Sequence, residues 1–441
     1  MSSRPFRPAV CWAALACLVV PMFASYFFDD SLSSVSHLFR DPGSLALGWD
    51  SRDLGNFIGD YSLLCVCGGL IVGGILLDMF GIRLMGSVFV GMMLLGGILA
   101  YTGVAAGLPK AEAIALGRAG RMLFGLGSEI AGVAVTRSIA KWFKGSSHMS
   151  LAMGLQLAIA RSGTALALIA APFIVGVPKS YYSLADTARP ALTGLFLLLA
   201  GAAAWAVFVG MDRGFDSRMG LKRGRGTIEE EDKFSFRDIL GLLRNRRFVT
   251  IGLLCVTFYC CVSSFKKFGT SVVIPRFGIE DSAAGIMVAM IPFFTIVFTP
   301  LFGALVDKTG RAVRWMVLGA AAVLGGHLCL AFAPQGVQFF GYAGIALLGL
   351  GYSLVPSAMW PSVPRLVSER NLGTAYSLIY WIQNVGLFFV PKAVGHIFVA
   401  SPGLEGVVKV EWIFISLGIC AVALALSLQE KSKKSENILQ I

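Results

Sequence analysis

Long apolar stretches alternate with short polar loops along almost the whole chain. A helix that crosses a lipid bilayer needs about 20 mostly apolar residues. By that length the pattern predicts twelve membrane-spanning helices. They are expected at residues 9–34, 53–79, 83–105, 112–140, 147–175, 189–211, 248–272, 282–306, 313–333, 337–364, 373–399 and 411–428.

One long polar stretch divides these spans into six and six. We therefore expect a six-helix bundle over residues 1–211, a linker over 212–247 and a second bundle over 248–441. The segment FSFRDILGLLRNRRF at the end of the linker predicts a short amphipathic helix at the membrane surface. A plain linker is the alternative.

Composition and charge agree with a membrane protein. Only 14% of the residues are charged and 56% are hydrophobic, whereas soluble domains carry about 25% charge. The net charge of +12 does not indicate nucleic-acid binding, because most lysines and arginines lie in short loops on one side. This bias predicts that both termini are cytoplasmic. The nine cysteines have no metal-ligand spacing, so we expect no metal and no cofactor.

A short motif recurs once in each half. Gly74-x3-Asp78-x2-Gly81 follows the second span, and Gly303-x3-Asp307-x2-Gly310 follows the eighth at an offset of 303 − 74 = 229 residues. The second glycine permits a tight turn, and the carboxylate is suited to bind a helix N-terminus or a nearby arginine. Such contacts hold two bundles together in one state and release them in another. We assign gating to Asp78, Gly81, Arg83, Asp307, Gly310 and Arg311.

This loop resembles the signature G-x3-D-[RK]-x-G-R-[RK] of the major facilitator superfamily. The first copy departs from it at Met79 and Ile82, which implies a thinner charge network there. Arg121-x3-Gly125-x-Gly127 is similar to the arginine pattern of that superfamily's fourth span, so Arg121 joins the gating set. The resemblance implies an all-helical membrane fold of two pseudo-symmetric six-helix bundles with alternating access about a central cavity.

Longer stretches are similar to the branch of that superfamily that contains a lysosomal dipeptide transporter. In that branch an acidic residue on the fourth span and an arginine on the fifth bind the charged ends of the dipeptide, which implies Glu129 and Arg161 here. The short N-terminus has no dileucine signal, so we expect a bacterial plasma membrane rather than a lysosome. The similar stretches are SYFFDD at 25–30, FGIR at 80–83, WFKG at 142–145, GLQLAIAR at 154–161, FGALVDKTG at 302–310, GYSLVPSAMWPSV at 351–363 and LGTAYSLIYWIQN at 372–384.

The cost of charge inside a membrane points to the same pair. An ionised side chain at mid-bilayer costs roughly 2.5–3.5 kcal/mol, so it normally faces a cavity or a partner. Glu129 and Arg161 each lie 16 residues from Gly145, because 145 − 129 = 161 − 145, which predicts equal depth on antiparallel helices. We expect an ion pair that a substrate ammonium and carboxylate replace; a purely structural ion pair is the alternative. Arg137, two turns from Glu129, is assigned to the gate.

Two further sets complete the candidate residues. Carboxylates in spans one and two and lysines in spans seven and eleven are expected to close an outer gate as salt bridges, or to include a proton site. Snorkelling to the surface is the alternative for Asp30 and Lys266. These residues are Asp29, Asp30, Asp60, Lys266, Lys267 and Lys392. Polar groups within spans are expected to line a substrate cavity with Lys392, although helix packing is an alternative for Trp360. They are Gln156, Tyr352, Trp360, Gln383 and Asn384.

The sequence therefore predicts a secondary transporter or uniporter for small zwitterions, with dipeptides as the favoured substrate. The additional lysines leave open an organic or phosphorylated anion. A non-transporting membrane sensor or partner subunit is the alternative of another class. No H-E-x-x-H, G-x-S-x-G or phosphate-binding loop indicates an enzyme. Expected partners are the small molecule and the lipid bilayer, with an accessory membrane protein as an open alternative.

Overall fold

The computed structural model describes residues 8–143, 148–219, 241–367 and 372–434. These residues are almost entirely helical and contain twelve helices long and apolar enough to cross a membrane. The predicted twelve spans are therefore confirmed.

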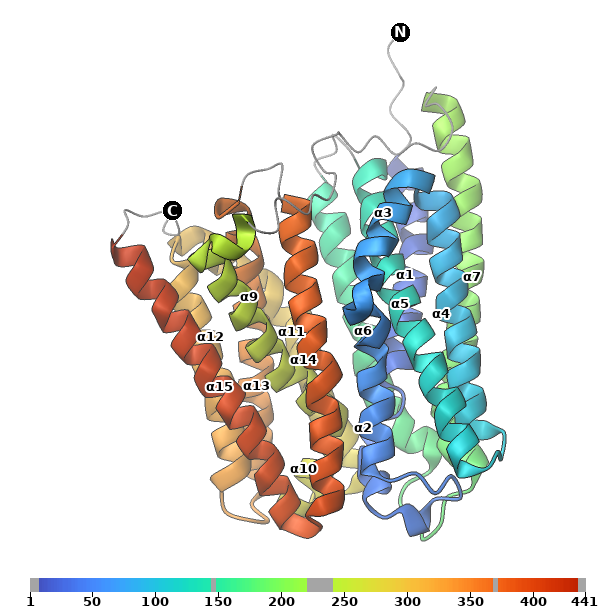
Figure 1. Cartoon of the computed structure of the whole chain (residues 1–441), viewed down its shortest axis with the longest axis vertical. Helices are drawn as coiled ribbons and strands as arrows, with labels where there is room; N and C mark the ends of the chain where they lie inside the picture. Colours follow the sequence, from blue (N-terminus) through green and yellow to red (C-terminus); the bar gives the residue numbers. More distant parts are fainter. Residues whose placement is uncertain (1–7, 144–147, 220–240, 368–371, 435–441) are drawn as a thin grey trace.

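Figure 1 shows two groups of helices side by side. The first group contains α1 (Pro8–Asp30), α2 (Ser51–Gly59), α3 (Leu70–Phe80), α4 (Ile82–Ala105), α5 (Lys110–Trp142), α6 (Met149–Val175) and α7 (Leu184–Met219). The second group contains α9 (Arg246–Tyr259), α10 (Phe265–Phe277), α11 (Asp281–Thr309), α12 (Ala312–Phe332), α13 (Gln338–Met359), α14 (Leu372–Ala400) and α15 (Gly403–Lys434).

Helices α2 and α3 form one span, and so do α9 and α10. Each of these two spans is interrupted near its middle, at residues 60–69 in the first and 260–264 in the second. The start of α1 and the end of α15 lie on the same side of the molecule (Figure 1). We call this the terminal side and the opposite side the distal side.

The sixth span is longer than the sequence predicts. Helix α7 continues past residue 211 to Met219, because two aspartates beyond that point have basic partners on neighbouring helices. Arg83 lies 2.9 Å from Asp216, and Lys141 lies 2.8 Å from Asp212 and 2.6 Å from Asp216. Of the predicted amphipathic helix at 234–248, residues 234–240 lie outside the described residues, 241–244 are helical and 246–248 belong to α9.

Both copies of the repeated motif end a helix at a glycine with positive φ, although only Gly310 is in the left-handed helical region. Gly81 and Gly310 both have positive φ, at +83° and +63°, a conformation that glycine adopts without strain. The expected pairing of Asp307 with Arg311 is not formed, since both side chains are exposed and neither has a salt bridge among the described residues. Arg83 pairs with α7 instead, and the side chain of Asp78 lies outside the description.

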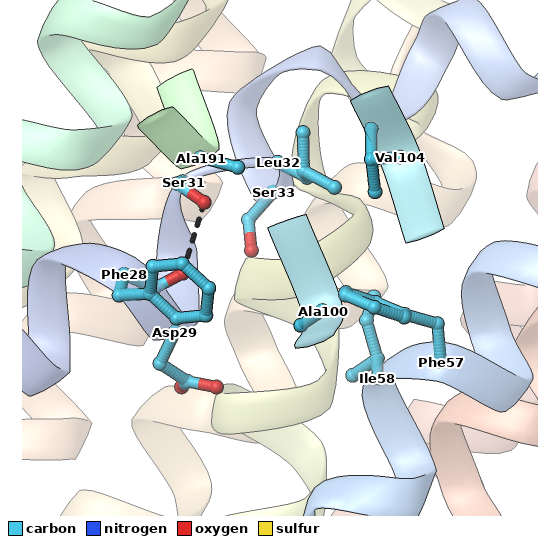
Figure 2. A pocket seen from close by; sticks show the side chains of 10 residues that line it. All are labelled: Phe28, Asp29, Ser31, Leu32, Ser33, Phe57, Ile58, Ala100, Val104 and Ala191. Atoms are coloured by element: carbon cyan, nitrogen blue, oxygen red, sulfur yellow. Dashed lines mark hydrogen bonds between the residues drawn. The ribbon is translucent and has the colours of Figure 1, made fainter. Parts of the chain in front are cut away.

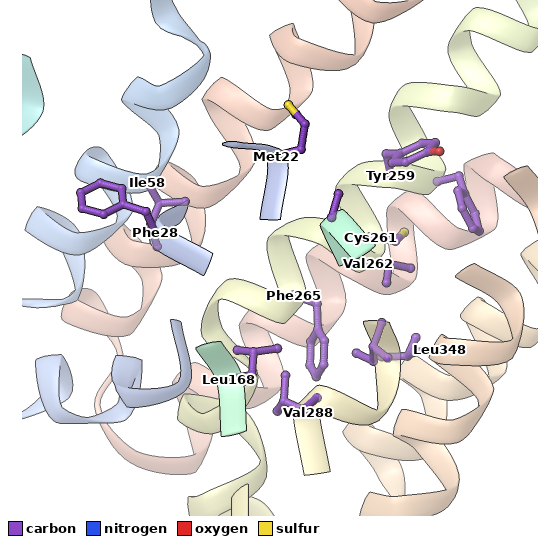
Figure 3. Packing of buried hydrophobic residues seen from close by; sticks show 14 of the residues in the cluster. Met22, Phe28, Ile58, Leu168, Tyr259, Cys261, Val262, Phe265, Val288 and Leu348 are labelled. Atoms are coloured by element: carbon purple, nitrogen blue, oxygen red, sulfur yellow. The ribbon is translucent and has the colours of Figure 1, made fainter. Parts of the chain in front are cut away.

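The two groups pack against each other through apolar side chains and glycines. Figure 3 shows part of one continuous buried cluster, with Met22 and Leu168 from the first group and Phe265 from the second. Helices α2 and α14 meet at Gly55 and Gly395, where a Cβ on Gly55 would lie 3.1 Å from the Cα of Gly395. Small residues at such crossings allow close packing of membrane helices.

Candidate functional site

Glu129 lies near the middle of the molecule on α5 and is half-buried. Its Oε1 accepts a hydrogen bond of 3.1 Å from the Tyr61 hydroxyl. The same hydroxyl lies 3.3 Å from the Ser128 Oγ, which is 2.5 Å from the Oγ of Ser25 on α1. The carboxylate is therefore held by a neutral hydroxyl within the first group of helices.

Arg161 lies on the neighbouring helix α6 and is also half-buried. Its guanidinium donates a hydrogen bond of 3.2 Å to the Thr299 hydroxyl on α11, in the second group of helices. The expected ion pair with Glu129 is therefore not formed, because each charged group faces a different neutral partner. Tyr26 of α1 interacts electrostatically with both, and we take the space between these two opposite charges as the candidate site.

Aromatic side chains of the second group form one wall of this space. Trp360 donates 3.0 Å to the Tyr259 hydroxyl and stacks on Tyr380 with ring centroids 5.1 Å apart. The Tyr352 hydroxyl lies 3.0 Å from the Ser263 Oγ. Tyr380, 43% exposed, interacts electrostatically with Glu129. This aromatic wall presents stacking surfaces and hydroxyls to a small ligand.

The exposure along α5 shows from which side the space is reached. Val133, one turn from Glu129 toward the terminal side, is 39% exposed, and Thr136 is exposed as well. In the distal direction the same helix carries Arg121, whose side chain is buried. The candidate site is thus more open toward the terminal side than toward the distal side.

Three predicted cavity residues carry side-chain amides. Gln383 accepts a hydrogen bond from the Cys255 Sγ at 3.4 Å, which joins α14 to α9. Asn384 is buried and donates 3.1 Å to the carbonyl oxygen of Tyr380, while its own Oδ1 has no partner. Gln156 is half-buried on α6. These amides stay candidates for ligand contact, and only Asn384 has an unsatisfied buried acceptor.

Toward the distal side, carboxylates of the first group meet lysines of the second. Asp29 lies 2.6 Å from Arg121 and 2.5 Å from Lys267. Asp30 lies 2.8 Å from Lys266 and 2.7 Å from Lys267. Buried charges of this kind require such partners, because desolvation costs several kcal/mol per ion.

Asp60 completes this arrangement on the interrupted second span. It is fully buried and lies 2.5 Å from Arg118 and 2.6 Å from Lys392. Lys392 is thus engaged by Asp60, which corrects its assignment to the substrate cavity. We call the eight side chains the distal charge cluster: Asp29, Asp30, Asp60, Arg118, Arg121, Lys266, Lys267 and Lys392.

A small void lies beside the distal charge cluster. Figure 2 shows the side chains that line this void, with Phe28 and Asp29 on one side and Phe57 and Ile58 on the other. The void has a volume of about 10 Å³. Such a void holds about one water molecule. Farther toward the distal end, Arg40 donates 2.9 Å to the Ser271 carbonyl oxygen and 2.6 Å to that of Gly403 across the two groups. The distal side is closed.

The sequence assigned Arg121 to gating but did not single out Arg118. The two arginines are three residues apart on α5, so they share one helix face and each reaches a different carboxylate. That spacing was a readable signal. No sequence signal identified Tyr61, Tyr259 or Thr299, because hydroxyl-bearing residues in spans are common and their directions depend on the fold. Arg137 lies half-buried on the terminal part of α5.

Comparison with known proteins agrees with this architecture. The model of the Major Facilitator Superfamily matches the chain in two overlapping regions, residues 9–391 and 256–438. The chain belongs to this superfamily. Its fold and relatives are those of transporters and not of enzymes.

The similar curated proteins share one description. The lysosomal dipeptide transporter MFSD1 of Danio rerio is 31% identical over 363 residues, which cover 81% of this chain and 74% of that protein. The Homo sapiens protein of the same name is 29% identical over 342 residues, covering 76% and 68%.

Solved structures share the fold at low identity. A POT family transporter in complex with 5-aminolevulinic acid has a TM-score of 0.68 at 14% identity, covering 95% of this chain and 96% of that one. A D-xylose-proton symporter has a TM-score of 0.65 at 16% identity, with the same coverage. These likenesses support the fold alone.

Proposed function

We propose that this superfamily member moves dipeptides, or closely similar small zwitterions, across a membrane by alternating access. The observation that carries the proposal is the pair Glu129 and Arg161. These two opposite charges lie on adjacent helices inside the membrane-spanning region, and neither has a salt bridge among the described residues. Uncompensated charge is costly there, so a ligand that supplies both counter-charges is favoured. The similarity to lysosomal dipeptide transporters supports the same substrate class.

In this proposal each end of the ligand replaces a neutral partner. The substrate carboxylate takes the place of the Thr299 hydroxyl at Arg161, where two parallel charge-assisted hydrogen bonds replace one weaker bond. The substrate ammonium binds Glu129 beside Tyr61. The peptide unit and side chains of the ligand then contact the aromatic wall around Trp360.

The distal charge cluster is the gate in this proposal. Its salt bridges join the two groups of helices while the site is reached from the terminal side, and they separate when the halves rock to the opposite arrangement. We propose that the terminal side is cytoplasmic and that the chain resides in a bacterial plasma membrane. The excess of lysine and arginine in the terminal-side loops supports this orientation.

The structure weakens the support for an anion transporter. That alternative rested on three additional lysines, and each of them lies within 3 Å of an aspartate in the distal charge cluster. The lysines therefore have counter-charges already, and they are not available to an anionic substrate while the gate is closed.

A thermal-shift comparison of purified protein tests the substrate class. A ligand at 100 times its Kd stabilises the folded state by about 2.7 kcal/mol, so dipeptides are expected to raise the Tm by several degrees. Glu129→Gln is expected to remove this stabilisation, and Lys392→Ala to retain it, because Lys392 lies in the gate. Stabilisation by organic or phosphorylated anions that survives Glu129→Gln and fails in Lys392→Ala would instead establish the anion transporter.

A further inference from the structure

Tyr61 lies at the interruption of the second span, directly after Asp60. Its backbone is held against α5 at Gly125, where any Cβ would collide with the Tyr61 carbonyl oxygen. This contact explains the glycine of the Arg121-x3-Gly125 motif in structural terms. Tyr61 therefore packs directly against α5, with its hydroxyl 3.1 Å from Glu129.

The same residue contacts the distal charge cluster in two ways. Its chain neighbour Asp60 binds Lys392 across the two groups of helices. Its ring lies under the guanidinium of Arg121, 5.4 Å from the ring centroid, and Arg121 in turn binds Asp29. Tyr61 thus contacts the candidate ammonium site through its hydroxyl. It contacts the distal charge cluster through its ring, and its backbone joins it to Asp60.

We propose that Tyr61 is a positioning residue that links occupancy of Glu129 to the distal gate. The inference rests on the proposed function. Without substrate, the hydroxyl donates to Glu129 and fixes the segment that carries Asp60. An arriving ammonium competes for the same carboxylate with a full positive charge in a low-dielectric site, so it displaces the hydroxyl. The Asp60 segment is then free to move away from Lys392.

This link predicts that the loaded protein opens its distal gate faster than the empty protein. When substrate is present on both sides of the membrane, exchange uses only conformational changes of the substrate-bound protein. Net uptake also requires the empty protein to return to its starting conformation. In the wild type the rate of exchange therefore exceeds the rate of net uptake. Without the hydroxyl the empty protein loses its latch, and the two rates converge.

Tyr61→Phe in liposomes tests the link, because it removes the hydroxyl and keeps the ring. We expect the ratio of exchange to net uptake to fall by about tenfold, toward one, since a hydrogen bond to a charged group is lost. Tyr342→Phe makes the same chemical change at an exposed position and should keep the wild-type ratio. A Tyr61→Phe ratio equal to that of the wild type overturns the link. A merely structural defect gives this result, because it lowers both rates alike.

A second measurement does not depend on the substrate. Ser271→Cys introduces a thiol in the closed distal seam, where Ser271 is fully buried and lies 3.0 Å from the Ser36 Oγ. Without ligand, Tyr61→Phe should increase the labelling of Cys at 271 by an impermeant maleimide several-fold over the otherwise identical parent. Unchanged labelling overturns the latch. Failure of the wild type to carry dipeptides refutes the proposed function and leaves this labelling test intact.

Discussion

Arg161→Ala is expected to abolish dipeptide uptake while the protein stays folded. Removing one partner of a buried charged hydrogen bond costs about 2–5 kcal/mol, which lowers affinity at least roughly 30-fold. The fold should tolerate the change, because among the described residues the hydrogen-bond partner of Arg161 is the neutral Thr299, so its loss leaves no carboxylate there without a partner.

The measurement is uptake of a labelled dipeptide into liposomes at equal amounts of folded protein. Arg189→Ala is the matched control, since Arg189 is about half exposed and its contact with Asp186 is a surface salt bridge. Such pairs contribute about 0–1 kcal/mol, so this variant should transport normally. Unchanged uptake by Arg161→Ala would remove Arg161 from the binding site.

Lys267→Glu is expected to stop the transport cycle by holding the distal side open. Lys267 lies 2.5 Å from Asp29 and 2.7 Å from Asp30, so the substitution brings three carboxylates together where two were neutralised. Like charges at this distance repel strongly inside a protein. Lys267→Met removes the attraction without adding repulsion, and it should have a smaller effect because Asp29 keeps Arg121 and Asp30 keeps Lys266.

The readout is labelling of Ser271→Cys by an impermeant maleimide, together with uptake. Labelling should increase from the wild type through Lys267→Met to Lys267→Glu, and uptake in the last should fall at least about tenfold, a shift of only 1.4 kcal/mol. Lys409→Glu reverses a charge at an exposed position on the same side and should change neither. Equal labelling in all variants would show that these charges do not hold the distal side closed.

The sequence predicted the features that depend on local pattern. Apolar length located twelve spans, and the two Gly-x3-Asp-x2-Gly motifs located two helix ends, because a positive φ there favours glycine. Charge in the first and second halves also indicated which carboxylates and lysines meet. These predictions rest on the solvent that each residue faces or on backbone conformation, and both are encoded locally.

The errors concern side-chain direction. Glu129 and Arg161 are on adjacent helices as expected, but Tyr61 and Thr299 come from helices whose rotation no spacing rule fixes. Glu129 accepts a hydrogen bond from Tyr61, and Arg161 donates one to Thr299. The expected ion pair between the two charged groups is not formed. A count of residues gives the depth along a helix and the relative face within it, but it does not give how that helix is rotated against its neighbours.

Helix ends were misjudged where charge is neutralised by a distant partner. Helix α15 begins at Gly403 and not near residue 411, and α7 continues through Asp212 and Asp216. Glu411 is fully buried because His327 of α12 lies 2.8 Å away. A hydropathy window treats such a carboxylate as a boundary, since the partner that offsets its charge is 84 residues away in the chain.

In the proposed mechanism, Glu129 and Arg161 bind the two charged ends of one dipeptide. Its most direct test is uptake by the purified wild-type protein in liposomes of a free dipeptide, its N-acetyl form and its C-terminal amide. We expect saturable uptake of the free dipeptide and uptake at least roughly 30-fold slower for each blocked form, because each lacks one charge. Equal uptake of all three, or no uptake of the free dipeptide, would contradict it.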